Sequence, residues 1–292
     1  MTPGIHLVHK PVGPTSFSVM QSLRARSAEK VCHGGALDPF ASGLLPILVE
    51  PATKLFDYLH DAPKVYEATV RWGVETDNGD PTGRAVFWGE PTVPNTPDRL
   101  AGVLRVFHGW HEQVPPPTSN KRVGGERAYA KAHRGEAFEL PPARVYLHEA
   151  QWLGHDLPRE SRIRLVVRGG FYVRAFARDL GRFLRCGAHL AALHRASIGP
   201  WQDPGPGGHV ELHGRAILPW AKTRVLTDQE VGELRQNRAI PIGELLAPDW
   251  PLPDHFPPGD PPVRGFHLGR FAFLLRLKNG QLTSITALAG NM

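Results

Sequence analysis

The segment Cys32–Lys54 reads CHGGALDPFASGLLPILVEPATK and joins a glycine-rich turn, one aspartate and a long apolar run. Asp38 stands between the turn and the apolar residues Gly43–Val49, which places it at the edge of a buried element. A carboxylate in this position has two interpretations. Asp38 can cap a turn in which the next residue, Pro39, fixes φ. Alternatively it performs chemistry, and then it needs a nearby cation to stay ionised in a partly dry cleft.

A second segment, Gly169–Arg174, reads GGFYVR and offers such a cation. Its pattern is that of a strand ending in an arginine at the start of a helix. A buried guanidinium in that place can form a forked ion pair with a carboxylate. The alternative is that Arg174 faces solvent at the helix start. Local chemistry leaves both alternatives open, for Asp38 as well as for Arg174.

Length and composition describe a globular protein with one large domain and a small one. The chain has 292 residues, 41% of them hydrophobic, and a net charge of +6 that favours polyanionic partners without identifying one. Cys32 and Cys186 match no CxxC spacing, so we expect neither a disulfide framework nor a cysteine zinc site, and a reducing cytosol fits. No apolar run approaches about 18 residues, and the first residues lack the pattern of a signal peptide, so no membrane segment is expected.

Periodicity predicts both strands and helices. The stretches Tyr66–Trp72 and Arg162–Arg168 alternate polar and apolar residues, as strands with one buried face do. A helix is predicted from Thr15 to Arg26, capped by Thr15 or Ser16. A longer helix is predicted from Arg174 to about Ala196, because apolar residues recur there at spacings of three or four.

These elements predict an α+β domain with a large, mostly antiparallel sheet over residues 1–222. Residues 223–292 are assigned to a small β-rich domain. Its clearest signal is a hairpin in which Arg270–Leu277 and Leu282–Leu288 flank Lys278–Gln281. Pro248–Val263 contains seven prolines and is predicted to be an extended connection.

One basic segment, Val114–Pro142, interrupts the predicted domain. It opens with three prolines and carries five lysines and arginines against three glutamates. Charge alone makes a solvated surface hairpin as good an interpretation as a binding element.

Six segments resemble, in the same order, the motifs of the TruB family of tRNA pseudouridine synthases, and they extend over most of the first 200 or so residues. The segments are Lys10–Ser16 (family pattern KPxGxTS), His33–Gly43 (GHTGxLDPxAxG), Tyr66–Asp80, Pro115–Tyr129 (PPxxSAxKxxGxxxY), Gly170–Gly181 (GTYIRxLxxDLG) and Leu193–Gly199 (LRRxxxG). Their ordered recurrence is more specific than any single motif.

The resemblance assigns roles around a flipped base. It implies that Asp38 is the catalytic carboxylate and that Arg174 pairs with it. Tyr66 and Leu193 would contact the two faces of the base, and Tyr172 would line the same pocket. The family pattern further places His33 in the space that the base leaves in the RNA. It also places Lys10 and Pro11 as support for the catalytic loop.

The family also implies the fold and the reaction. We expect the pseudouridine synthase fold with a PUA-like C-terminal domain, and isomerisation of the T-loop uridine at position 55 of tRNA. Neither a cofactor nor a metal is implied. The basic segment 114–142 would grip the T arm through phosphate contacts. We also expect a cytoplasmic protein that is a monomer and has no contact with a membrane.

The sequence departs from the family patterns at several positions. Cys32-His33-Gly34 replaces Gly-His-Thr, Asn120 stands where alanine is usual, and Arg122 replaces a lysine. Two other functions remain open: an RNA chaperone that does no chemistry, and the guide-RNA-dependent relative of box H/ACA particles. The inserted segment and the short tail favour the stand-alone enzyme.

Overall fold

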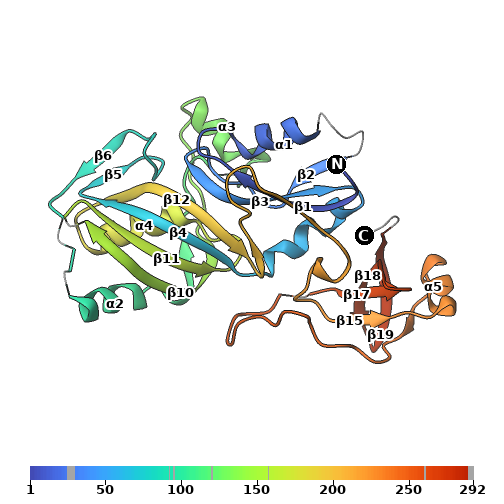
Figure 1. Ribbon diagram of the computed structural model, residues 1–292. Helices are drawn as coiled ribbons and strands as arrows, with labels where there is room; N and C mark the ends of the chain where they lie inside the picture. Colours follow the sequence, from blue (N-terminus) through green and yellow to red (C-terminus); the bar gives the residue numbers. More distant parts are fainter. Residues whose placement is uncertain are drawn as a thin grey trace. The chain divides into compact units, whose positions relative to one another are not determined.

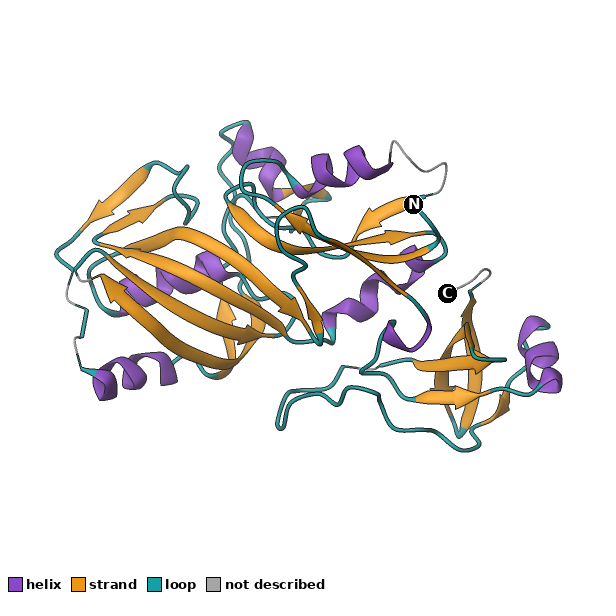
Figure 2. Ribbon diagram, in the orientation of Figure 1, coloured by secondary structure: helices purple, strands orange, loops and turns teal. Residues whose placement is uncertain are grey.

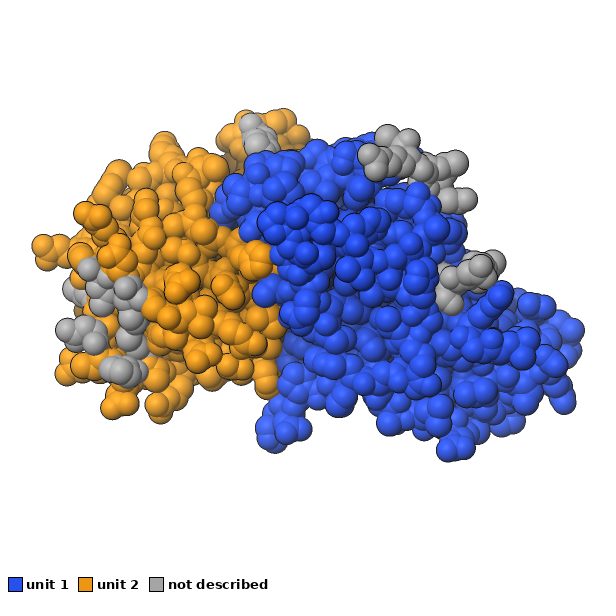
Figure 3. Space-filling view, viewed as in Figure 1, with its two compact units in different colours: residues 1–63, 196–292 blue, residues 64–195 orange. Residues whose placement is uncertain are grey.

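The fold was analysed in a computed structural model that describes residues 1–24, 30–91, 93–94, 96–119, 121–156, 158–259 and 261–288. The chain divides into two compact units (Figure 3). Unit 1 comprises residues 1–63 and 196–292, and unit 2 comprises residues 64–195. The main sheet has ten strands, and a separate sheet of five strands lies near the C-terminus.

The strand β3 (Ala41–Val49) organises the first part of unit 1. It pairs antiparallel with β1 (Gly4–Lys10) and with the short β2 (Val31–His33), and β14 (His209–Leu212) pairs with the other edge of β1. Both faces of β3 are buried. Leu44 and Leu48 belong to the larger core, whereas Leu45 and Ile47 pack with the helix α1 (Ser16–Arg24). This explains why the apolar run after Asp38 is continuous and does not alternate.

Short elements complete the part of unit 1 that contains β1, β2, β3 and α1 (Figure 1). They are the 3₁₀ helices η1 (Ala52–His60) and η2 (Gly214–Ala216), and β13 (Trp201–Gln202), which pairs with β12 (Ala188–Ile198). The prediction of α1 is confirmed as far as Arg24, and Arg26 lies outside the described residues. Thr15 is the cap, because its Oγ1 accepts a hydrogen bond of 3.0 Å from the Ser18 amide.

The C-terminal sheet begins at Thr223 and has the order β15-β17-β18-β19-β16. Its elements are β15 (Thr223–Val225), α5 (Asp228–Arg235), β16 (Ile240–Pro241), β17 (Val263–His267), β18 (Arg270–Lys278) and β19 (Gln281–Ala287). The predicted hairpin is confirmed: Asn279 and Gly280 form its two-residue turn, both with positive φ. The described residues between Pro248 and Val263 form neither helix nor strand, as predicted.

Unit 2 is built on four antiparallel strands in the order β4-β11-β10-β7. These are β4 (Lys64–Trp72), β11 (Glu160–Val167), β10 (Ala143–Asp156) and β7 (Gly109–Gln113). Both predicted strands are confirmed. The helix α4 (Val173–Phe183) covers one face of these strands (Figure 2), and Phe176 on α4 is fully buried. Unit 2 also contains α2 (Pro97–Arg105) and the hairpin of β5 (Val74–Thr76) with β6 (Ala85–Trp88).

The predicted helix from Arg174 to Ala196 is wrong beyond Phe183. The chain turns through Arg185 and Gly187, which both have positive φ, and continues as β12. Leu190 and Leu193 are buried strand residues, and their spacing of three fits a strand only because β12 is buried on parts of both faces. The tight turn depends on Gly181, where a Cβ would lie 2.3 Å from the Ala188 amide nitrogen.

The basic segment 114–142 contains regular structure. Strands β8 (Arg122–Val123) and β9 (Glu126–Arg127) form a hairpin, followed by the helix α3 (Ala128–His133). The α+β class with a large, mostly antiparallel sheet and a small C-terminal β sheet is therefore confirmed, whereas the domain boundary after residue 222 stays a prediction. Among the described residues, no helix is long and apolar enough to cross a membrane.

Candidate active site

The loop that carries Asp38 is fixed by the segment Lys10–Ser16. The Ser16 hydroxyl donates to the Leu37 carbonyl at 2.9 Å and accepts from the Leu37 amide at 2.8 Å. Gly13 donates its amide to the Pro39 carbonyl at 2.8 Å. Ser16 and Leu37 are both buried, so these bonds lie away from water. The backbone on each side of Asp38 is thus held by residues more than twenty positions earlier in the chain.

Lys10 adds a charged anchor to the same loop. Its side chain is fully buried, and Nζ donates to the carbonyl oxygens of Pro11, Pro39 and Ala41 at 3.0, 3.3 and 2.6 Å. Three carbonyl dipoles therefore replace the water that a buried ammonium loses. This arrangement accounts physically for the predicted supporting role of Lys10, and Pro11 contributes through its carbonyl.

Asp38 is partly exposed in this loop, and its carbonyl accepts from the Ala41 amide at 3.0 Å. The backbone therefore makes a turn at Asp38-Pro39, as the turn interpretation predicts. His33 is half-buried at the end of β2, opposite Ile47 of β3. At the adjoining Gly34, an added Cβ would lie 2.5 Å from Leu59 Cδ1, so the Leu59 side chain would have to shift.

The other predicted site residues belong to unit 2. Tyr66 on β4 and Leu193 on β12 are buried, with 8% and 7% exposure. Arg174 is 6% exposed in the first turn of α4. Burial raises the pKa of the Tyr172 hydroxyl, and the neighbouring Arg174 charge opposes that rise. Tyr172 and Arg174 thus lie together, whereas the predicted pair of Arg174 with Asp38 joins the two units and stays a prediction.

Loops of unit 2 hold the Arg174 guanidinium. Nη1 donates to the Asn78 carbonyl at 3.0 Å and to the Thr118 hydroxyl at 2.6 Å, and Nη2 donates to the Thr118 carbonyl at 3.2 Å. The Asp80 carboxylate lies 3.6 Å from Nη1. The surroundings of Arg174 are therefore polar and fixed, which excludes the solvent-facing alternative.

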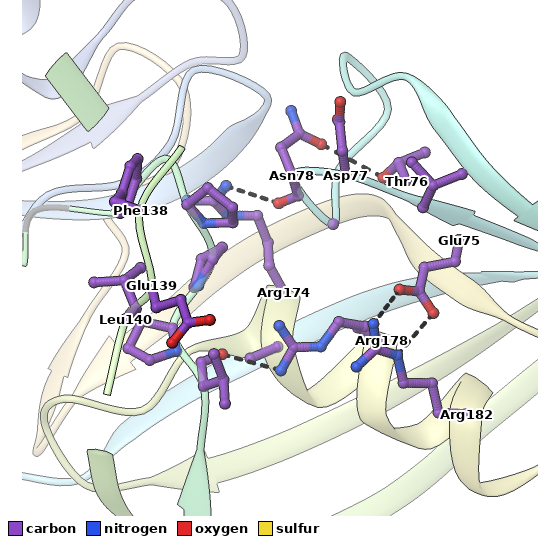
Figure 4. Close-up of a pocket in the computed structure, with 17 residues that line it drawn as sticks. Glu75, Thr76, Asp77, Asn78, Phe138, Glu139, Leu140, Arg174, Arg178 and Arg182 are labelled. Atoms are coloured by element: carbon purple, nitrogen blue, oxygen red, sulfur yellow. Dashed lines mark hydrogen bonds and ion pairs between the residues drawn. The ribbon is translucent and has the colours of Figure 1, made fainter. Parts of the chain in front are cut away.

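A cavity of about 580 Å³ in unit 2 lies beside this arginine (Figure 4). Arg174, Arg178 and Arg182 line it from successive turns of α4, and Asn78 and Phe138 lie on different sides of it. Its lining residues are Glu75, Thr76, Asp77, Asn78, Gly79, Val86, Val114, Pro115, Pro116, Pro117, Phe138, Glu139, Leu140, Arg174, Ala175, Arg178 and Arg182.

The other two arginines also have partners within unit 2. Arg182 forms a two-pronged pair with Glu75, with Nη2–Oε1 and Nε–Oε2 distances of 2.6 and 2.9 Å. That hydrogen bonding raises the pKa of Arg182. Arg178 donates to the Val114 carbonyl at 3.0 Å. Sequence reasoning missed both residues, although they follow Arg174 at successive spacings of four, which indicates one shared helix face.

Two basic and two acidic side chains of the segment 114–142 pair with each other. Arg134 bridges Glu126 and Glu136 at 2.7 and 2.5 Å, and Lys131 lies 3.2 Å from Glu136. These hydrogen bonds lower the pKa of both glutamates. Among the described residues, no group of three or more His, Cys, Asp or Glu side chains is arranged to hold a metal ion.

Comparison with known proteins gives one consistent family. Residues 23–173 match the family described as TruB family pseudouridylate synthase (N terminal domain). A protein of Rhodopseudomonas palustris named tRNA pseudouridine synthase B is 41% identical over 200 residues, which are 68% of this chain and 54% of that protein. A protein of Xanthomonas campestris pv. campestris with the same name is 40% identical over 203 residues, 69% of this chain and 65% of the relative.

The matches thus span between about half and two thirds of these relatives. Among solved structures, the fold is similar to a chain of a Cbf5-Nop10-Gar1 complex, with a TM-score of 0.68, 20% identity and coverage of 99% of this chain and 85% of that one. This likeness concerns the fold alone. From the family match and the sequence identities together, the chain belongs to the TruB family of pseudouridylate synthases.

Proposed function

We propose that the protein isomerises a uridine of tRNA to pseudouridine, with Asp38 as the catalytic carboxylate. The observation that carries the proposal is the anchoring of the Asp38 loop by Lys10, Gly13 and Ser16. A catalytic group has to be held in a fixed place relative to its substrate, and this loop is fixed on both sides of the aspartate. The name of the relatives at about 40% identity, tRNA pseudouridine synthase B, supports the substrate.

The reaction needs no oxidant and no activated donor. After nucleophilic attack by Asp38 on either the ribose or the ring, the N1–C1′ bond breaks and the uracil rotates in its pocket. The C5–C1′ bond then forms, C5 loses its proton, and N1 gains one. The target base must first leave its stack. In this proposal Tyr66 and Leu193 contact the base, Tyr172 lines the pocket, and His33 occupies the vacated space in the RNA.

In this proposal, the positive charge of Arg174 keeps the Asp38 carboxylate ionised. A partly buried carboxylate stays ionised when a guanidinium pairs with it, and ionisation is what a nucleophile requires. The contacts of the Arg174 guanidinium with Asn78, Thr118 and Asp80 support this role, because they fix the orientation of the guanidinium.

We further propose the finer assignments that the family suggests: position 55 of the T loop, recognition of the T arm by segment 114–142, action as a monomer, and a cytoplasmic location. The stand-alone type is favoured over the guide-RNA-dependent type by the sequence identities of about 40% to proteins named tRNA pseudouridine synthase B.

The test is a single-turnover assay with purified protein, a T-arm stem-loop and no guide RNA or cofactor. We expect pseudouridine at one position, no product with Asp38→Asn, and RNA binding close to that of the wild type. Asp57→Asn, an exposed aspartate in unit 1, is the matched control and should retain activity. Product from the Asp38→Asn variant would exclude aspartate catalysis, and binding without product from the wild type would favour the chaperone alternative.

A further inference from the structure

A glutamine lies at the end of β7 on the buried face of the unit 2 sheet. Residues two apart on a strand share a face, so Gln113 lies on the face of His111, whose cross-strand partner Val145 is buried. The His111 ring meets the Phe171 ring edge to face at 5.9 Å between centroids, so the chain before α4 contacts this face. Gln113 is 1% exposed. A polar side chain in such a place lowers stability unless it is hydrogen-bonded inside the protein.

The Gln113 side chain holds the start of α4. Its Oε1 accepts a hydrogen bond of 3.0 Å from the Tyr172 amide. This contact fixes which way the side-chain amide points, because only its oxygen can accept from an N–H group. Tyr172 is the N-cap residue of α4. From a neighbouring strand, Gln113 thus supplies the acceptor for the N-cap amide that a glutamate inside the helix supplies in a capping box.

A second contact joins the same end of β7 to α4. Arg178 Nη2 donates to the Val114 carbonyl at 3.0 Å, one helical turn beyond Arg174. The end of the strand therefore contacts α4 both before and after Arg174 in the sequence. Tyr172 and Arg174, for which contacts with the base and with the catalytic aspartate are proposed, are held from a strand that belongs to the main sheet. Groups supported by such regular elements are placed more precisely than groups on loops.

Gln113 is an unfavourable choice for packing alone. Its Nε2 is buried and has no hydrogen-bond partner among the residues that the structure describes. A buried donor without an acceptor lowers the free energy of unfolding, whereas an apolar side chain of similar length would not. Residues that lower stability in this way are typical of functional sites. The glutamine at this position therefore indicates a role beyond filling the core.

We propose that Gln113 is a positioning residue: it fixes the backbone at the start of α4 and thereby places the Tyr172 and Arg174 side chains for the reaction. The inference rests on the proposed function. Gln113 acts through Tyr172 and contacts neither the base nor Asp38. Most of the affinity for RNA comes from phosphate contacts, so loss of the Gln113 contact lowers kcat and leaves RNA binding nearly unchanged.

Gln113→Met tests the proposal, because methionine has a similar length and lacks the accepting oxygen. We expect the single-turnover rate with a T-arm stem-loop to fall by about 30-fold, within the hundredfold that a misplacement of about 1 Å can cost. RNA affinity and the urea midpoint should stay near the wild-type values, because the lost hydrogen bond is offset by removal of the unpaired donor. Hydrogen–deuterium exchange in a peptide of residues 169–176 should become faster. Gln151→Met, at an exposed position of β10, is the matched control and should change none of these.

Gln113→Glu keeps an acceptor oxygen beside a helix N-terminus, where negative charge is favoured. Exchange in residues 169–176 should stay as slow as in the wild type, which keeps the test valid if Gln113→Met unfolds. Three outcomes would overturn the proposal: a wild-type rate in folded Gln113→Met, unchanged exchange in that variant, or faster exchange in Gln113→Glu. A lower urea midpoint with a wild-type rate would assign Gln113 to stability alone. A wild type that forms no pseudouridine refutes the proposed function instead, and the exchange rates then decide separately whether Gln113 holds α4.

Discussion

Replacing Ser16 by alanine removes one hydroxyl that holds both backbone groups of Leu37, directly before Asp38. Each hydrogen bond contributes about 1 kcal/mol, and a buried backbone group left unpaired costs about 1–3 kcal/mol. Ser16 is 3% exposed and Leu37 is 6% exposed, so water replaces the lost partner poorly. We therefore expect the free energy of unfolding to fall by about 2–4 kcal/mol.

The same loss should appear in catalysis, because the backbone that positions Asp38 loses one of its anchors. If about 2 kcal/mol of it acts on the loop in the native protein, kcat falls by about 30-fold. KM should change much less, because Ser16 lies beneath the loop and touches no proposed substrate contact. Single-turnover kinetics with a T-arm stem-loop measures the rate, and tRNA binding is measured separately.

Two variants separate positioning from general destabilisation. Ser22→Ala removes an exposed hydroxyl of the same helix, which bonds only the Val19 carbonyl among the interactions described, and should leave kcat unchanged. Ser16→Thr keeps the hydroxyl and should recover part of the rate. A Ser16→Ala enzyme that is destabilised but turns over at the wild-type rate would refute the positioning argument.

Three further predictions concern stability. Thr227→Ala breaks the capping box with Glu230 at the start of α5 and should lower stability by about 1 kcal/mol in urea titrations, with an unchanged midpoint as the contrary result. Burial lowers the pKa of His6 from 6.5, so the unfolded chain binds the proton more tightly and stability should fall as the pH drops below 6.5; His6→Gln should flatten that dependence between about pH 7 and 5 in thermal melts. Gly181→Ala forces a Cβ to within 2.3 Å of the Ala188 amide nitrogen and should lower the free energy of unfolding by about 3 kcal/mol, which a wild-type denaturation midpoint would contradict.

The local sequence predicted those elements whose residue patterns fit only one kind of secondary structure. The hairpin around Asn279-Gly280 was predictable because few residue pairs adopt two positive φ angles at low cost. The strand β4 was predictable because every second side chain is buried. The strand β12 was mistaken for helix, because a strand buried on both faces shows apolar spacing of three as readily as a helix does.

The candidate site was only partly accessible to the same reasoning. Lys10 and Ser16 lie in a recognisable motif, but their contacts with the backbone of Leu37, Pro39 and Ala41 follow from tertiary structure. The partners of Arg174 come from two loops, at Asn78 and Thr118, that no periodicity connects to α4. Such contacts depend on how distant segments meet, which local patterns do not encode.

The contacts of Lys10 with the backbone of the Asp38 loop bear on which positions of the loop can vary in sequence. Nζ donates to three carbonyl oxygens, and every residue type supplies that acceptor. The loop can therefore exchange side chains at positions such as Ala36 and Phe40 without losing its shape, whereas Lys10 itself has no equivalent substitute. In a lineage of such proteins, we therefore expect the lysine to be retained while positions 36 and 40 vary.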